Sequence, residues 1–327
     1  MNGCTAADKP RIAILLAVYE PRMDWLQEQL RSLDAQTYPN LMLYVRDDGS
    51  RTVSFERIEQ CVQQNIHSFS YKVEQNEKNL GSNSTFERLT REAEGEYFAY
   101  CDQDDVWLPE KLSILQEKLC QTNALLVCSD MKIIDENGRQ IADSITKIRR
   151  NHVFRSGKGM AHTLFFSNFV TGCTMLIRAE ECKKAAPFCP YMVHDHYLAL
   201  WCAERGEIVS LAQSLVRYRI HDGNQTGMMA GVADKASYGR VRIELVCDRL
   251  RWLESHFPCA GDTQRELQAG LKWAQARNRN WKHQGGAFEL WKFRRFNPLT
   301  TFFEIFAAYF PEPLFMWFVG LKKKNLL

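Results

Sequence analysis

The chain has 327 residues, of which 45% are hydrophobic and 25% are charged. This composition is that of an ordinary soluble protein with enough apolar residues for a substantial core, in one large or two smaller domains. Its 11 cysteines form no Cys-x-x-Cys pair, which argues against a disulfide framework and a zinc site. Cysteines within apolar runs are expected to be core thiols of a cytoplasmic protein, and residues 1–10 lack a signal-peptide core.

The net charge of +3 is unevenly distributed along the chain. Residues 271–327 contain ten Lys or Arg and three Asp or Glu, a net charge of +7, so residues 1–270 carry −4. The C-terminal end is therefore a separate basic feature.

Strand and helix patterns alternate through the first part of the chain. Short apolar runs predict strands at residues 11–18, 41–45, 69–73, 97–101 and 124–128. Helical spacing predicts helices between them, at residues 25–33 (with Asp24 as N-cap), 55–64, 79–94 and 110–120. This alternation predicts an α/β fold with a mostly parallel central sheet flanked by helices.

The pattern changes after residue 130. We expect a hairpin at 131–141, a loop over the site at 144–167, a strand at 169–177, a helix at 194–204 and a strand at 214–220. From residue 238 on, the chain is predicted to be helical and is rich in aromatic residues. The predicted regions are an N-terminal tail (1–10), an α/β domain (11–230) and a helical extension (231–327).

The extension ends in a strongly apolar stretch, residues 296–321. A bilayer span needs ~20 uninterrupted apolar residues, but charged residues and prolines interrupt this stretch before Lys322-Lys323-Lys324 closes it. Aromatic residues beside basic ones are typical of helices that lie in the membrane interface. The alternative is a helical pair that packs on the main domain or forms a dimer contact.

Acidic or polar residues follow three of the predicted strands. They are Tyr19-Glu20, Asp47-Asp48 and Asp102-Gln103-Asp104-Asp105, and parallel strands bring such ends to one edge of a sheet. Carboxylates gathered there would repel one another, so a divalent metal carrying a diphosphate is expected between them. Taken alone, the third group could instead be a surface turn that caps the helix beginning near Pro109. Missing Gly-x-Gly-x-x-Gly and Walker-type patterns argue against a dinucleotide cofactor and a P-loop.

In their order along the chain, these motifs resemble the glycosyltransferases of family 2, which have the nucleotide-sugar-binding GT-A fold. The matching segments are Leu15-Leu16-Ala17-Val18-Tyr19-Glu20, Gln36-Thr37-Tyr38-Pro39-Asn40, Arg46-Asp47-Asp48-Gly49-Ser50, Asn79-Leu80-Gly81, Cys101-Asp102-Gln103-Asp104-Asp105, Thr171-Gly172-Cys173-Thr174 and His194-Asp195. The resemblance covers residues 10–225. Within it, residues 218–227 are most similar to rhamnosyltransferases of bacterial surface polysaccharide assembly.

The resemblance implies which residues bind the donor. The nucleotide pocket would be lined by residues at strand and loop ends: Ala17, Tyr19, Glu20 (where the family usually has Asn) and Gly81. Asp48 would hydrogen-bond the base, and Asp102 would meet the ribose or the metal. Asp104 would be a ligand of the Mg²⁺ or Mn²⁺ ion that carries the diphosphate. His221 could contact the diphosphate or complete the metal site; a structural histidine at a strand end is the equal alternative.

The resemblance also implies residues on the acceptor side. Asp195 aligns with the catalytic base, which would take the proton of the acceptor hydroxyl as its oxygen attacks the anomeric carbon and inverts it. His194, which replaces the family's usual glutamate, and His196 would be positioning or surface residues, poorly placed to share a metal. Trp107 would floor the acceptor site, with Asp105 turned the same way; a core tryptophan is the alternative.

The sequence thus predicts an inverting, metal-dependent glycosyltransferase, peripheral on the inner face of the cytoplasmic membrane. Its donor would be dTDP-rhamnose or a UDP-sugar, and its acceptor a saccharide, lipid-linked, in cell-surface polysaccharide synthesis. Homo-oligomers are compatible with the sequence, and no nucleic acid is expected because the apolar end suits lipid better. One alternative is a sugar nucleotidyltransferase, but such enzymes need a Gly-rich, basic signature near the first strand, and Tyr19-Glu20-Pro21 does not resemble it. The other is a non-catalytic nucleotide-binding, membrane-associated protein.

Overall fold

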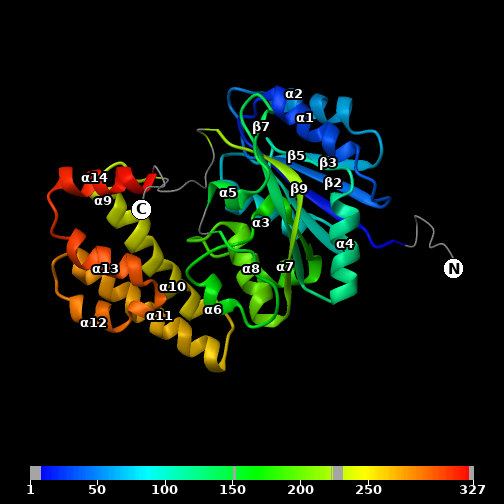
Figure 1. Ribbon diagram of the computed structural model, residues 1–327. Coiled ribbons are helices and arrows are strands. Elements are labelled where there is room, and N and C mark those ends of the chain that lie inside the picture. The colour runs from blue at the N-terminus through cyan, green and yellow to red at the C-terminus, as the bar shows by residue number, and fades with distance from the viewer. Residues whose placement is uncertain (1–8, 150–151, 222, 224–230, 324–327) are drawn as a thin grey trace. The chain divides into compact units, whose positions relative to one another are not determined.

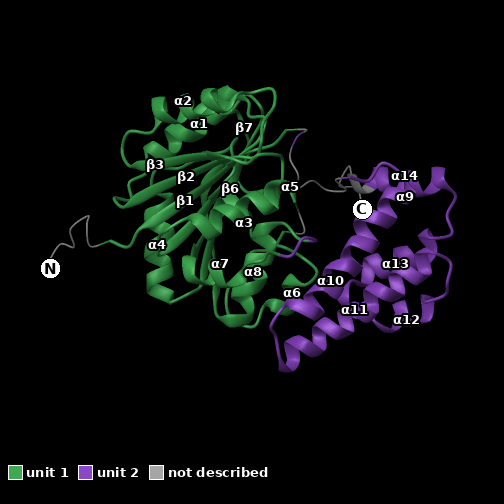
Figure 2. Ribbon diagram, turned by 180° about the vertical axis from the view of Figure 1, so that it is seen from behind, with its two compact units in different colours: residues 1–188, 192–221 green, residues 189–191, 222–327 purple. Residues whose placement is uncertain are grey.

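The computed structural model describes residues 9–149, 152–221, 223 and 231–323. These residues form two compact units, one from residues 1–188 and 192–221 and the other from residues 189–191 and 222–327 (Figure 2). Residues 1–8 of the predicted N-terminal tail and the predicted domain boundary at residue 230 lie outside the described residues.

A mixed sheet forms the centre of the first unit (Figure 1). Its strands lie in the order β3-β2-β1-β4-β8-β6-β9-β5, and β7 pairs with β6 beside this path. The parallel part consists of β3 (Ser70–Gln75), β2 (Leu41–Asp47), β1 (Ile12–Val18) and β4 (Tyr97–Cys101). The other strands are β5 (Val106–Trp107), β6 (Leu126–Ile134), β7 (Gln140–Ala142), β8 (Met175–Arg178) and β9 (Ile208–Arg219). The predicted α/β fold is confirmed.

The central strands are apolar because both faces of the sheet are covered there and neither contacts solvent. Every residue of β4 is buried, and in β1 only Ala17 is partly exposed. Strands covered on both faces carry continuous apolar runs, not an alternating pattern. On one face, buried apolar residues of α1, α2 and α4 share a hydrophobic core with β1 and β2. The bounds of these helices are Met23–Asp34, Phe55–Asn65 and Lys111–Thr122.

The remaining helical segments of this unit are shorter or lie later in the chain. They are α3 (Ser82–Glu92), α5 (Ile145–Ile148), α6 (Ala161–Leu164), the 3₁₀ turn η2 (Gly172–Thr174), α7 (Ala179–Ala185) and α8 (His194–Arg205). Two of them, α5 and α6, lie in the segment predicted to be a loop. The N-cap of α1 is Arg22, and Asp24, the predicted cap, lies in the first turn.

Two predicted strands have different bounds in the structure. The strand expected at 169–177 begins only at Met175, because the chain first makes the turn η2. The strand expected at 214–220 already begins at Ile208, because the first residues of β9 also pair in parallel with β6. The predicted hairpin at 131–141 is confirmed as the antiparallel pair of β6 and β7.

The polar segments that follow β1, β2 and β4 lie at one edge of the sheet, as predicted. Val18 pairs with Asp47 and Leu16 pairs with Cys101, so the three strands end at neighbouring positions. Ligand sites of open α/β sheets lie outside the carboxyl ends of the strands. This edge is therefore where the candidate site is built.

Helices form the second unit, as expected for the chain after residue 238. They are α9 (Lys235–Tyr238), the π-helical turn η3 (Gly239–Glu244), α10 (Leu245–His256), α11 (Gly261–Trp281), α12 (Ala287–Lys292), the 3₁₀ turn η4 (Arg294–Phe296), α13 (Pro298–Ala307) and α14 (Glu312–Lys323). Tyr238, Ile243, Phe315 and Val319 are buried in its core, so part of the apolar stretch 296–321 packs inside this unit. In the described part of the chain, every helix is too short or too polar to cross a membrane.

Candidate active site

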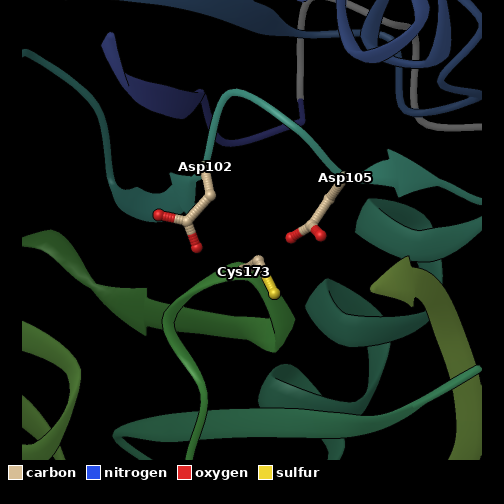
Figure 3. A group of neighbouring side chains, drawn as sticks. All are labelled: Asp102, Asp105 and Cys173. Atoms are coloured by element: carbon tan, nitrogen blue, oxygen red, sulfur yellow. The ribbon is translucent and has the colours of Figure 1, made fainter. Parts of the chain in front are cut away.

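The loop between β4 and β5, residues 102–105, carries the acidic cluster. Figure 3 shows the carboxylates of Asp102 and Asp105 and the thiol of Cys173 around a common space, with their ligand atoms within 4.8 Å of one another. Asp105 is fully buried, and the backbone N–H of Arg219 in β9 donates to its Oδ1 atom at 3.0 Å. Two carboxylates of the loop therefore face the turn η2.

Burial and mutual repulsion raise the pKa values of these carboxylates. Burial, followed by repulsion from Asp105 and Asp104, raises the pKa of Asp102 well above its usual value. Burial and the neighbouring Asp104 raise the pKa of Asp105 to about 7. The buried ammonium of Lys111 donates to the carbonyl of Cys173 at 2.6 Å, and burial lowers the pKa of this amine to about 7. One buried amine only partly offsets the carboxylates, and a bound cation would stabilise their ionised form.

Asp104 and His221 make contact at the exposed side of the loop. The Nε2 atom of His221 lies 2.7 Å from Oδ2 of Asp104, and each side chain is 16% exposed. The ring of Trp25 packs on His221, with the ring centroids 4.9 Å apart. The fold thus brings together the two residues predicted to bind the metal, although 117 positions separate them in the sequence. Because both retain exposure, a ligand can reach them.

Trp107 and Asp105 are buried. Trp107 is 2% exposed and belongs to the hydrophobic core, where the amine of Lys111 lies 2.9 Å from its ring centre. Because β5 pairs with β9, the indole is turned inward and Asp105 is held by the N–H of Arg219. The burial of Trp107 favours the alternative drawn from the sequence, a core tryptophan. The acceptor-side places of Trp107 and Asp105 stay predictions that this burial does not support.

Asp195 lies in the first turn of α8, where the positive end of the helix dipole favours a carboxylate. The backbone N–H of Gly172 donates to its Oδ2 atom at 2.9 Å, and the side-chain amide of Asn168 donates to Oδ1 at 3.1 Å. Burial outweighs these contacts and raises the pKa of Asp195 to about 6. Its charge also contributes to the raised pKa of Asp102. Asp195 is thus fixed beside the acidic loop and ionised at neutral pH. The position of Asn168 in the sequence offers no signal for this contact.

His194 is buried, which does not support its predicted place on the acceptor side. Its ring packs against Phe86 and Tyr100, with centroids 4.0 and 5.0 Å apart, because this face of α8 lies on α3 and β4. Burial lowers the pKa of His194 to about 3, so the ring is neutral. His196 is also buried, with its Nε2 atom 2.6 Å from the carbonyl oxygen of Leu164. Both histidines support the position of α8 from within.

Asp48 anchors the loop that leads into α3. Its Oδ1 atom accepts hydrogen bonds from the side chain of Asn76 at 2.8 Å and the N–H of Leu80 at 2.9 Å. Its Oδ2 atom accepts from the N–H of Gly81 at 2.8 Å, and Gly81 has a φ of 82°. Both oxygens are thus engaged by donors of the chain itself. The predicted hydrogen bond from Asp48 to a base stays a prediction, and it would have to share one of these oxygens.

Gln103 ties the end of β1 to the acidic loop, a role that the sequence alone did not indicate. The N–H of Tyr19 donates to Oε1 of Gln103 at 2.8 Å, and Nε2 of Gln103 donates to the carbonyl of Tyr19 at 3.0 Å. The ring of Tyr19 is exposed, as stacking on a base would require. The carboxylate of Glu20 accepts hydrogen bonds from the N–H groups of Arg51 and Thr52, so it shapes the loop after β2.

Replacing Gly172 by alanine is expected to destabilise the junction between η2 and α8. A Cβ atom at this position would lie 2.7 Å from Nε2 of His194, closer than such atoms approach. Overpacking of this kind costs about 1–3 kcal/mol, and denaturant unfolding of the full chain would measure it. Gly320→Ala is the control, because its Cβ would meet no atom within 4 Å. Equal unfolding free energies for the two variants would show that α8 moves aside without cost.

The family model described as Glycosyl transferase family 2 matches residues 14–184. The match covers more than half of the chain and includes the acidic loop and Cys173. The chain therefore belongs to glycosyltransferase family 2, and the resemblance seen in the sequence is confirmed.

Curated relatives are named as glycosyltransferases or, in one case, as a rhamnosyl transferase. An uncharacterized glycosyltransferase of Nostoc sp. is 26% identical over 225 residues, which are 65% of this chain and 66% of that protein. The dTDP-rhamnosyl transferase RfbG of Shigella flexneri is 26% identical over 234 residues, which are 67% of this chain and 75% of that protein. The chain thus spans 66% of the length of the first of these two relatives.

Solved structures share the fold of the chain. The structure of S. aureus TarS 1-349 in complex with UDP-GlcNAc is 17% identical, with a TM-score of 0.57 over 97% of this chain and 89% of that chain. The mannosyltransferase PcManGT from Pyrobaculum calidifontis, in complex with GDP-Man and Mn2+, is 13% identical, with a TM-score of 0.57 over 99% of this chain and 83% of that chain. The likeness confirms the GT-A fold.

Proposed function

We propose that this chain transfers a sugar from a nucleoside-diphosphate sugar to a hydroxyl group of a saccharide, inverting the anomeric carbon. The observation that carries the proposal is the position of Asp195, whose Oδ2 atom accepts from the N–H of Gly172 in the turn η2 that also holds Cys173 beside Asp102 and Asp105. Transfer by one displacement needs a group that removes the hydroxyl proton and a site that holds the leaving diphosphate. The edge of the sheet offers candidates for both.

A divalent metal fits the residues at the exposed side of the acidic loop. Oδ2 of Asp104 and Nε2 of His221 lie 2.7 Å apart, close enough to join one coordination sphere. We assign the metal to this pair, with Asp102 beside it, and an imidazole ligand favours Mn²⁺ over Mg²⁺. When bound, the metal neutralises charge that builds up on the leaving diphosphate. PcManGT, which shares the fold, is in complex with Mn2+, and this supports the choice of a divalent metal.

A second donor set, Asp102, Asp105 and Cys173, is less suited to this ion. Burial raises the pKa of the Cys173 thiol well above its usual value, so the sulfur keeps its proton. Mg²⁺ and Mn²⁺ prefer oxygen ligands, and a protonated thiol is a poor ligand for any metal. Asp105 is also fully buried. The Asp104–His221 pair is therefore the better candidate.

Other residues around the site would remove the acceptor proton and hold the nucleotide. Asp195, held by Gly172 and Asn168, would accept the proton of the acceptor hydroxyl as the C–O bond forms and the bond to the diphosphate breaks. The exposed ring of Tyr19 would pack on the base of the nucleotide. Gln103 keeps this tyrosine against the acidic loop, so nucleotide and diphosphate would be held in one orientation.

We further propose dTDP-rhamnose as the donor and a lipid-linked saccharide at the cytoplasmic face of the membrane as the acceptor. RfbG, a dTDP-rhamnosyl transferase, supports the donor; the basic, aromatic C-terminal region supports the membrane location. Asp195 beside the acidic loop favours transfer over the two alternatives from the sequence, a sugar nucleotidyltransferase and a non-catalytic nucleotide-binding protein.

A donor screen tests the proposed function. The full chain is incubated with Mn²⁺ and dTDP-rhamnose, UDP-glucose, UDP-GlcNAc or GDP-mannose, and the released nucleoside diphosphate is measured. We expect the fastest release from dTDP-rhamnose and none after EDTA is added. A preference for a UDP-hexose would contradict the rhamnose assignment. Synthesis of a nucleotide sugar from a sugar phosphate and a nucleoside triphosphate would instead identify a nucleotidyltransferase.

A further inference from the structure

Helix α13 buries two polar residues in the second unit and exposes three large apolar ones, while Ala307 and Phe303 pack on the core of the unit. Thr301 and Glu304 are 0% and 1% exposed. Leu299, Phe302 and Phe306 are 84%, 59% and 52% exposed and share one side of the helix at helical spacing. We call these three residues the α13 face. A helix on a globular core normally has the opposite arrangement, so this face is built for surroundings other than water.

Specific contacts fix the orientation of α13. The guanidinium of Arg277 in α11 donates to both carboxylate oxygens of Glu304 at 2.6 Å, and the hydroxyl of Tyr238 donates to Oε1 at 2.9 Å. The indole N–H of Trp273 donates to the hydroxyl of Thr301 at 3.0 Å. Rotating the helix to bury Phe302 and Phe306 would leave a buried guanidinium without its carboxylate, which is strongly unfavourable. The apolar residues therefore stay outside.

Basic residues precede the α13 face in the chain. Lys292, Arg294 and Arg295 are exposed, and Arg294 lies over the ring of Trp291, 4.6 Å from its centroid. Arg295 pairs with Glu266, whereas Lys292 and Arg294 make no ion pair with the described residues. Other exposed apolar side chains of this unit are those of Phe288, Trp291, Tyr309, Leu314 and Trp317. Unpaired positive charge beside aromatic side chains is the pattern of interfacial lipid binding.

We infer that the α13 face docks on a bilayer that contains anionic lipid. Leu299, Phe302 and Phe306 enter the boundary between headgroups and acyl chains, while Lys292 and Arg294 meet the phosphates. The helix lies in the plane of the membrane, as amphipathic anchors do. The inference rests on the membrane location in the proposed function and specifies the residues that produce it. A second copy of the chain or an apolar partner protein is the competing occupant.

Vesicle binding by the full chain tests the inference. The chain is sedimented with phosphatidylcholine vesicles, with or without phosphatidylglycerol at about 30%. We expect binding to the anionic vesicles, weakened by about tenfold or more in Phe302→Gln/Phe306→Gln because two buried aromatic contacts are lost. Lys292→Gln/Arg294→Gln should weaken binding to anionic vesicles and leave binding to neutral ones unchanged. Ile141→Gln, an exposed apolar residue of β7 in the first unit, is the matched control and should bind as the wild type does.

Three measurements keep the outcomes distinct. Unfolding curves and donor hydrolysis without vesicles show whether each variant is folded and whether the proposed activity exists, independently of lipid. Equal vesicle binding by the wild type and the phenylalanine variant, both folded, would overturn the inference. So would light scattering that shows a wild-type dimer, a monomeric Phe302→Gln/Phe306→Gln variant and no vesicle binding, because the face would then be an interface between copies.

Discussion

Replacing Asp195 by asparagine is expected to reduce sugar transfer by roughly 10²–10⁴-fold, the contribution of a positioned general base. The amide keeps the size of the side chain and can still accept the hydrogen bond from Gly172, so the fold should persist. It cannot accept the proton of the acceptor hydroxyl. Donor binding, measured by calorimetry with the nucleoside diphosphate, should stay unchanged because Asp195 would act on the acceptor. Asp262→Asn, an exposed residue of α11, is the control and should transfer normally.

The pH dependence of transfer gives the same assignment a second test. Burial raises the pKa of Asp195 to about 6, and a carboxylate is a base only when it is ionised. The transfer rate should therefore be constant at neutral pH and fall as the pH drops below about 6. In Asp195→Asn the remaining transfer rate should not fall as the pH drops below about 6. Normal transfer by the variant would place the base on another residue.

Replacing Asp104 by alanine should reduce transfer by about 10²–10³-fold, the usual effect of losing one stabilising group at a developing charge. The substitution removes the oxygen that lies 2.7 Å from Nε2 of His221, so the proposed metal would lose one of its two assigned ligands. The Mn²⁺ concentration that gives half-maximal activity should rise as well. Steady-state rates across a Mn²⁺ titration measure both effects.

The control for this variant is Cys173→Ser, which changes only the sulfur of the competing donor set. If Asp104 and His221 hold the metal, this variant should keep its Mn²⁺ dependence. The reverse result, normal metal dependence in Asp104→Ala and a changed one in Cys173→Ser, would move the site to Asp102, Asp105 and Cys173. Activity that survives both EDTA and the Asp104 substitution would remove the metal from the mechanism.

The sequence by itself determined the scaffold of the site. Apolar runs that end at acidic residues are local features, and their alternation with helical patterns requires parallel strands whose ends meet at one edge. For this reason the loop 102–105 and Asp48 could be found from the strand pattern, whereas only the family resemblance pointed to Asp195. The motifs that contain these residues are far apart in the sequence, and only the family resemblance indicated that they form one site. The structure agrees with it, because Asp104 contacts His221 and Asp195 contacts Gly172.

Only the tertiary structure decided which of these side chains face solvent. Asp104 and Asp105 are adjacent and chemically identical, yet pairing of β5 with β9 buries one and leaves the other partly exposed. His194 and Trp107 are buried by α3, β4 and β9, segments far from them in the chain. The burial of a side chain depends on segments that are distant in the sequence and pack against it. The residues next to it in the sequence do not indicate which segments these are.

The same limit applies to the C-terminal region. Its composition indicated aromatic helices with basic neighbours, but it did not indicate that Phe302 and Phe306 of α13 are exposed whereas Phe303 packs on the core. Arg277 and Tyr238 are buried and donate hydrogen bonds to Glu304. These bonds hold α13 with Glu304 facing the core. Local chemistry determined where the strands and the acidic loop lie. Long-range pairing of buried polar groups decided which side chains stayed exposed, because an ion pair such as Arg277–Glu304 holds its helix in one orientation.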